Sequence, residues 1–115
     1  MNSLYRRILV PIDGSDTAQR GLQEALSLAK LCDASLVLLS VVEYYPMMME
    51  MATATTWEMV TTDLRQQGQQ VLERAHDAAK AAGVASEAHL EDAAAARVCD
   101  VIVDQAREHQ CDLIV

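Results

Sequence analysis

The sequence contains no phenylalanine, one tryptophan and three tyrosines, so aromatic side chains supply little of its core volume. The core must instead be built from leucine, valine, isoleucine, alanine and methionine. Basic residues are also few, since 9 lysines and arginines stand against 17 acids and leave a formal net charge of -8. A domain this acidic is repelled by phosphate backbones and by anionic lipid. The composition therefore excludes nucleic acid and membrane surfaces as expected partners.

Cysteine is scarce as well, with Cys32, Cys99 and Cys111 as the complete set in 115 residues. An odd, sparse set of cysteines indicates reduced thiols and a cytoplasmic protein rather than a disulfide framework. The chain also lacks the run of roughly 18 apolar residues that a membrane span requires. Its N-terminal apolar run is interrupted by Pro11 and Asp13, which argues against a signal peptide.

The most informative segment is residues 8–15, which reads ILVPIDGS. Its aliphatic start does not alternate with polar residues, which predicts a strand covered on both faces and therefore central in a sheet. Asp13, Gly14 and Ser15 follow it, directly before a helical pattern. In an open α/β sheet, a strand that ends in a small polar turn before a helix is the usual place for a ligand. We therefore expect the functional site at this turn.

The remaining periodicity predicts strands and helices in alternation. A strand, a helix and a second strand within about 35 residues form a right-handed crossover with parallel strands. We expect one α/β domain over residues 1–115, a doubly wound parallel sheet with helices on both faces, flavodoxin-like strand order and a missing last strand. The expected helices cover residues 16–32, 57–82 and 93–110, and the later strands cover 35–42, 84–90 and 112–115.

Details of three elements follow from local signals. Asp16 is the expected N-cap of the first helix, with Ser15 as the alternative. The strand at 84–90 alternates apolar and polar residues, which suits a sheet edge with one wet face. The last strand, 112–115, is expected to be buried, and a buried strand seldom ends a domain. We therefore expect either a truncated chain or a last strand supported by a partner chain.

Residues 43–56, EYYPMMMEMATATT, break the periodicity and predict a long loop rich in methionine. A loop of this length is often a lid or a binding segment. The alternative is a partly ordered loop whose methionines pack at the rim of the core. The sequence leaves both interpretations open.

Three segments together resemble the universal stress protein family over essentially the whole chain. They read ILVPIDGS, LVLLSVVE and HQCDLIV, and they look like the first strand and turn, the second strand and the lead-in to the fourth strand. The resemblance implies a flavodoxin-like or Rossmann-like fold that commonly forms homodimers. In one branch of the family it also implies ATP binding and a role in stress signalling.

The resemblance also implies a site. Asp13 would lie at the adenosine end of the pocket, and Val41 would face the adenine through its backbone. Asp13 suits Mg²⁺ as well as a nucleotide hydroxyl, because a carboxylate oxygen suits a hard cation. Its local alternative is to accept backbone N–H groups in the turn. The candidate nucleotide-binding residues are Pro11, Ile12, Asp13, Gly14, Ser15, Val41 and Val42.

The sequence departs from the ATP-binding branch at one point. Those members carry a glycine-rich segment after the fourth strand, where backbone N–H groups cradle the phosphates. The sequence ends at Val115, before that segment would begin. The resemblance thus supports the adenosine half of a site. We expect a binding or signalling module with at most slow ATP hydrolysis, and the alternative is a nucleotide-free protein that acts by dimerising.

The remaining cysteines and histidines match no pattern for a metal or catalytic site. Cys99, His109 and Cys111 match no zinc spacing and lack a paired C-x-x-C, so we expect no metal site there and interpret both cysteines as small buried hydrophobic residues. His76 and His89 lie in polar surroundings, which predicts surface positions. The sequence shows no Ser/His/Asp or Cys/His arrangement that would predict a catalytic site.

Glu91 and Asp92 follow the third strand, where receiver domains keep a phosphorylated aspartate. A receiver also needs a pair of acids directly after its first strand, and Asp13 has only Asp16 nearby. We therefore do not expect a receiver domain.

Overall fold

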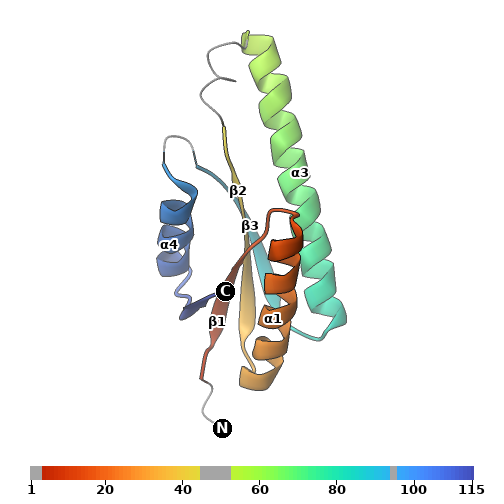
Figure 1. Ribbon diagram of the computed structural model, residues 1–115, viewed down its shortest axis with the longest axis vertical. Coiled ribbons are helices and arrows are strands. Elements are labelled where there is room, and N and C mark those ends of the chain that lie inside the picture. Colours follow the sequence, from red (N-terminus) through yellow and green to blue (C-terminus); the bar gives the residue numbers. More distant parts are fainter. Residues whose placement is uncertain (1–3, 45–52, 94–95) are drawn as a thin grey trace.

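The computed structural model describes residues 4–44, 53–93 and 96–115. Strands and helices alternate along the chain, as predicted (Figure 1). In chain order they are β1 (Arg7–Pro11), α1 (Asp16–Cys32), β2 (Ser35–Val42), α3 (Ala54–Ala81), β3 (Ser86–Asp92), α4 (Val98–Glu108) and β4 (Leu113–Ile114). Within the described residues, no helix is both long enough and apolar enough to cross a membrane.

The four strands form one parallel sheet in the order β3-β2-β1-β4. Helices α1 and α3 pack on one face, where they enclose Ile8, Val10, Leu36 and Leu38. Helix α4 packs on the opposite face, against a smaller cluster built around Leu9, Val37 and Leu39 (Figure 1). The predicted α/β class, with helices on both faces of a parallel sheet, is confirmed.

The order of the strands differs from the flavodoxin-like order that we expected. A flavodoxin-like sheet places its first strand between the second and the third. Here β1 lies between β2 and β4, and β3 is at the edge beyond β2, which is the order of a Rossmann half. The alternation of polar residues in β3 is the physical reason, because a strand with one wet face cannot occupy the middle of a covered sheet.

The two central strands are buried as predicted. Ile8, Leu9 and Val10 are at most 1% exposed, and residues 36–39 of β2 are buried to the same degree. Because neighbouring side chains point to opposite faces of a strand, such continuous burial requires cover on both faces. The sheet edge at β4 is different. Ile114 and Val115 are 42% and 40% exposed, so the prediction of a buried last strand is wrong for this chain.

The cap of α1 is Ser15 rather than Asp16, which corrects our first choice. The Ser15 Oγ accepts a hydrogen bond from the Ala18 backbone N–H at 3.1 Å. Serine has extended backbone dihedrals here, as an N-cap requires, whereas Asp16 is already helical. Asp16 keeps a favourable role as an acid in the first turn of the helix.

The other boundaries shift by a few residues. Helix α3 begins at Ala54, earlier than predicted, because Thr53 caps it through its hydroxyl oxygen. Residues 54–56 of the predicted loop are therefore helical, and its residues 45–52 lie outside the described residues. Helix α4 is shorter than predicted, and β3 begins and ends two residues later than predicted.

Candidate functional site

The turn after β1 is held by its own side chains. The Asp13 Oδ1 accepts a hydrogen bond from the Ser15 backbone N–H at 2.9 Å. Hydrogen bonding from the Ser15 side chain, followed by that from its backbone, lowers the pKa of Asp13. Gly14 has φ +84°, and a Cβ added there would lie 3.2 Å from the Val71 Cγ1. The turn therefore needs a glycine, and Asp13 fills the local role that we considered as its alternative.

A cleft of about 350 Å³ opens beside this turn, at the C-terminal ends of β1 and β2. Asp13 lines one side of it, the end of β2 forms the floor and α3 forms the far wall. The lining residues are Asp13, Ser40, Val41, Val42, Glu43, Leu64, Gln67, Gly68 and Val71.

Gly68 allows α3 to approach the sheet at this cleft. A Cβ added to Gly68 would lie 2.7 Å from the Leu90 Cδ1 and 3.2 Å from the Ser40 Oγ. Ser40 is itself only 5% exposed, so its hydroxyl group lies beneath the helix rather than in solvent. The close approach of helix and sheet fixes the inner wall of the cleft.

A second cleft of about 280 Å³ lies on the α1 side of the same turn. Ile12, Gly14 and Ser15 line this cleft, and Val71 lines both. Among the predicted site residues, Asp13, Val41 and Val42 therefore line the first cleft, and Ile12, Gly14 and Ser15 line the second. Pro11 ends β1 and lies opposite Leu39 of β2. The predicted residues gather around one turn, but they are divided between two hollows.

The groups in the first cleft suit an uncharged, partly polar ligand. Val41, Val42 and Val71 offer apolar contact, while the Gln67 amide can donate and accept hydrogen bonds. Asp13 and Glu43 give the rim two carboxylates, which accept hydrogen bonds and repel free anions. A planar heterocycle with hydroxyl groups fits this combination better than a phosphate does.

Sequence reasoning missed the contribution of α3 to this cleft. It did not single out Ser40, Gln67 or Gly68 as site residues. One signal was present, because a glycine inside a long helix costs about 1 kcal/mol relative to alanine and so calls for a packing reason. The reason is the contact with Ser40 and Leu90.

Beyond the cleft, an ion pair ties β3 to α3. The Arg65 Nη1 donates to both carboxylate oxygens of Asp92, at 2.7 and 2.6 Å, and the Tyr44 hydroxyl donates to Asp92 Oδ1 at 3.2 Å. The Tyr44 ring packs against that of Trp57, with centroids 5.2 Å apart. Asp92 thus has a structural role that joins the ends of β2 and β3 to the helix.

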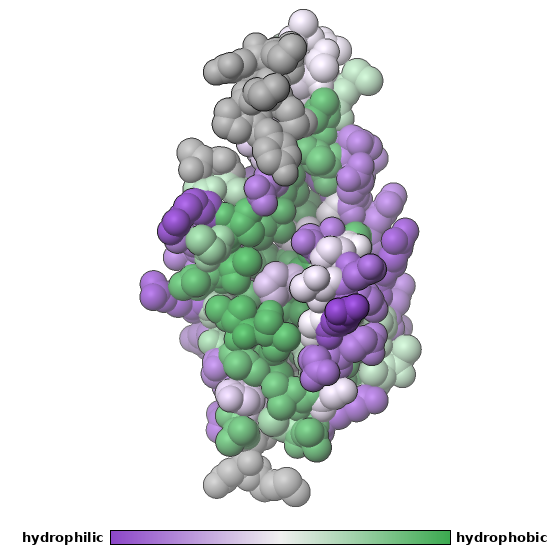
Figure 2. Space-filling view, viewed as in Figure 1, coloured by the Kyte–Doolittle hydropathy of each residue, from purple (hydrophilic) through white to green (hydrophobic). Residues whose placement is uncertain are grey.

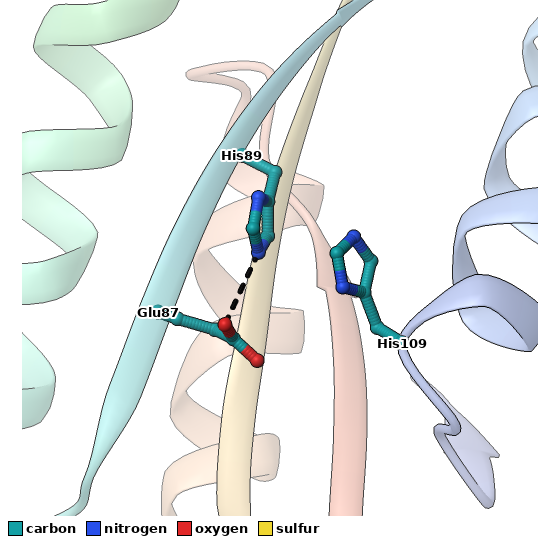
Figure 3. A group of neighbouring side chains, drawn as sticks. All are labelled: Glu87, His89 and His109. Atoms are coloured by element: carbon teal, nitrogen blue, oxygen red, sulfur yellow. Dashed lines mark ion pairs between the residues drawn. The ribbon is translucent and has the colours of Figure 1, made fainter.

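The burial of the histidines and cysteines differs in part from our expectation. His76 is exposed as predicted, but His89 is half-buried because it faces α4, with its ring stacked on that of His109 at a centroid distance of 4.0 Å (Figure 3). Cys99 is exposed on the first turn of α4, so its predicted burial is wrong. Cys111 is half-buried against the apolar cluster of this face, and burial raises the pKa of its thiol.

Comparisons of the sequence with known proteins agree with each other. The sequence model of the universal stress protein family matches residues 4–115. A universal stress protein of Methanocaldococcus jannaschii is 29% identical to this chain over 113 residues. The aligned region covers 98% of this chain and 64% of that relative, so the chain spans less than two thirds of the relative's length.

Solved structures show the same relationship. A universal stress protein family member from Burkholderia pseudomallei has a TM-score of 0.85 and 31% identity, over 99% of this chain and 82% of that one. A universal stress protein solved in complex with cAMP has a TM-score of 0.66 and 26% identity, over 97% of this chain and 72% of that one.

Proposed function

This chain belongs to the universal stress protein family, and from that premise we propose that it is a binding or signalling module for an adenine nucleotide, with ATP as the preferred candidate. The proposed site is the cleft beside Asp13 at the C-terminal ends of β1 and β2. Its turnover would be slow at most, because the adenosine part rather than the phosphates would occupy this cleft. The single observation that carries the proposal is the cleft itself, which lies at the carboxyl ends of two neighbouring parallel strands, the edge of an open α/β sheet at which ligands bind.

The lining of the cleft suggests how the nucleotide would lie. The backbone of Val41 and the side chains of Val42 and Val71 would contact the adenine, and Asp13 would accept a hydrogen bond from a ribose hydroxyl group. The carboxylates of Asp13 and Glu43 would repel bare phosphates, so the adenosine part would occupy this cleft. The relative in complex with cAMP supports an adenine ligand.

Magnesium would bind together with the nucleotide. The Asp13 Oδ1 already accepts the Ser15 N–H, which leaves its second oxygen for Mg²⁺ or for a ribose hydroxyl group. Ion and nucleotide together would offset the repulsion between the acidic rim and the phosphates.

Calorimetric titration of the protein with ATP and Mg²⁺ tests the proposal. We expect saturable heat, and we expect Asp13→Ala to weaken binding by about 10-fold, the effect of losing one hydrogen bond to a charged group. The matched control is Asp16→Ala, which also removes one negative charge, in the first turn of α1, but leaves the cleft lining intact. A titration without heat, or equal losses in the two variants, would refute the proposal.

Dimerisation without nucleotide is the second candidate function, and exposed apolar side chains on α4 and at β4 favour it. Val103, Ile114 and Val115 are 40–42% exposed. Figure 2 shows a broad apolar area over the part of the molecule where β1 and the C-terminal residue lie. Light scattering over a range of concentrations, with and without ATP, separates the two candidates. A dimer that Ile114→Lys disrupts, in a protein that gives no heat with ATP, would favour the second.

A further inference from the structure

A second group of side chains lies on the opposite face of the sheet from the cleft. Glu87 and His89 are two residues apart on β3, so both point toward the α4 face. His109 follows the last turn of α4 and points back toward them (Figure 3). One candidate ligand atom from each of the three residues lies within 4.8 Å of the others. The fold thus brings two imidazoles and a carboxylate together from distant parts of the chain.

Neighbouring groups hold each of these side chains in place. Arg7 forms an ion pair with the Glu87 Oε1, which leaves the Oε2 facing His89. Gln105 holds His109 from the other side, since its Oε1 lies 3.0 Å from the His109 Nε2. The Nδ1 of His109 is therefore the nitrogen that remains for a shared ligand. Partners of this kind orient metal-binding imidazoles and carboxylates in known sites.

The Nε2 of His89 is the atom that most needs a ligand. It is buried, and it has no hydrogen-bond partner among the described residues. The Glu87 Oε2 lies 3.3 Å away, which is ion-pair distance, but it does not form a hydrogen bond with this nitrogen. A buried polar atom without a partner is costly, so each such atom in a folded protein calls for an explanation, and a bound ion is one.

We propose that Glu87, His89 and His109 bind one divalent transition-metal ion, with Zn²⁺ as the best fit. Two histidines and one glutamate form a known three-residue donor set for zinc, with a fourth position left for water. In a tetrahedral zinc site the ligand atoms lie about 3.3 Å apart, and the Glu87–His89 pair already has this spacing. Mg²⁺ and Ca²⁺ prefer all-oxygen ligands and fit the two imidazoles poorly.

The proposed metal would connect two elements that are otherwise weakly joined at this edge. Glu87 and His89 belong to the edge strand β3, whereas His109 belongs to the end of α4. Zinc bound by all three would clamp the helix end to the strand, so it stabilises the folded chain by mass action. The proposed zinc site does not overlap the cleft beside Asp13, because α3 forms the wall of that cleft on the other face of the sheet.

Competition of the purified protein with a chromophoric chelator for ZnCl₂ tests the site. We expect one Zn²⁺ per chain, and we expect His89→Ala and His109→Ala each to weaken binding by at least about 10-fold. The matched control is His76→Ala, because the exposed His76 lies on α3 and is held by Ser86 instead. In this competition experiment all proteins carry Cys99→Ser, which removes an exposed thiol that would compete for zinc.

Imidazole NMR of the unsubstituted protein gives a test that does not depend on the folding of a variant. Saturating Zn²⁺ should shift the ring resonances of His89 and His109 and leave those of His76 unchanged. The proposal is overturned if no 1:1 complex forms, if zinc shifts the His76 ring instead, or if the His76 variant loses as much affinity as the other two. Binding that disappears with Cys99→Ser would identify an adventitious thiol site and would also overturn it.

Discussion

Asp112 fastens the start of β4 to the start of β1, and its removal should measurably destabilise the fold. Its carboxylate accepts the Arg6 backbone N–H at 2.9 Å and the Arg7 backbone N–H at 3.1 Å. A hydrogen bond contributes about 0.5–1.5 kcal/mol to stability, and two of them would give about 1–3 kcal/mol. Asp112 is exposed, so solvent compensates for part of the loss. We expect Asp112→Ala to lower the free energy of unfolding by about 1 kcal/mol.

The effect should depend on pH in a defined direction. Hydrogen bonds from the Arg6 backbone, and then from that of Arg7, lower the pKa of Asp112 below its ordinary value of 3.8. The unfolded chain therefore binds this proton more tightly than the folded chain does. The stabilisation from the charged carboxylate is fully present above about pH 5 and is lost as the pH falls through the lowered pKa.

Urea unfolding at pH 7 and at pH 3 measures both effects. The difference between the unsubstituted protein and Asp112→Ala should be larger at pH 7 than at pH 3. Asp104→Ala is the control, because Asp104 is an exposed acid on α4 and its loss changes the net charge equally. If Asp104→Ala destabilises the protein as much as Asp112→Ala, then net charge and not the strand-fastening contact is responsible. A difference that grows toward pH 3 would refute the reasoning about the pKa.

Three further outcomes can be checked by standard measurements. Ser15→Ala removes the cap of α1 and should cost about 1 kcal/mol in urea unfolding. Leu72 is 2% exposed, so Leu72→Ala leaves a cavity beneath α3 and should lower the free energy of unfolding by about 2–5 kcal/mol. Leu31 is 82% exposed, so Leu31→Ala should change it by less than about 0.5 kcal/mol. In zinc-free buffer at pH 8, Ellman's reagent should modify the exposed Cys99 faster than Cys111, because burial raises the pKa of the Cys111 thiol and limits its access.

Elements with strong local signals could be predicted from the sequence. The apolar runs that became β1 and β2 are covered on both faces, and the alternation in β3 correctly indicated an edge. The same alternation also argues against the flavodoxin-like order, because that order would put β3 inside the sheet. The exposure of Ile114 was not predictable, since an apolar tetrapeptide has the same pattern in a central strand and at an edge.

The candidate cleft was predictable only on its strand side. Asp13 and Val41 follow from the rule that parallel strands open a ligand site at their carboxyl ends, and both line the cleft. The contribution of Gln67 and Gly68 depends on the rotation of α3 about its own axis. That rotation is set by packing against Leu90 and Ser40. Hydrophobic periodicity in the sequence predicts only which broad face of the helix is buried.

The histidine cluster depends on topology and leaves no pattern in the sequence. Nineteen residues separate His89 from His109, a spacing unlike that of the short zinc motifs. The connection from β3 to β4 joins the two edges of the sheet, so α4 must cross over β2 and β1 on the way. Helix α4 returns antiparallel to the strands and therefore ends above their N-terminal halves. Glu87 lies in this part of the sheet, where it is next to Val37 of β2, and Val37 is next to Leu9 of β1. The strand order that we predicted incorrectly is therefore the feature that brings His109 to His89.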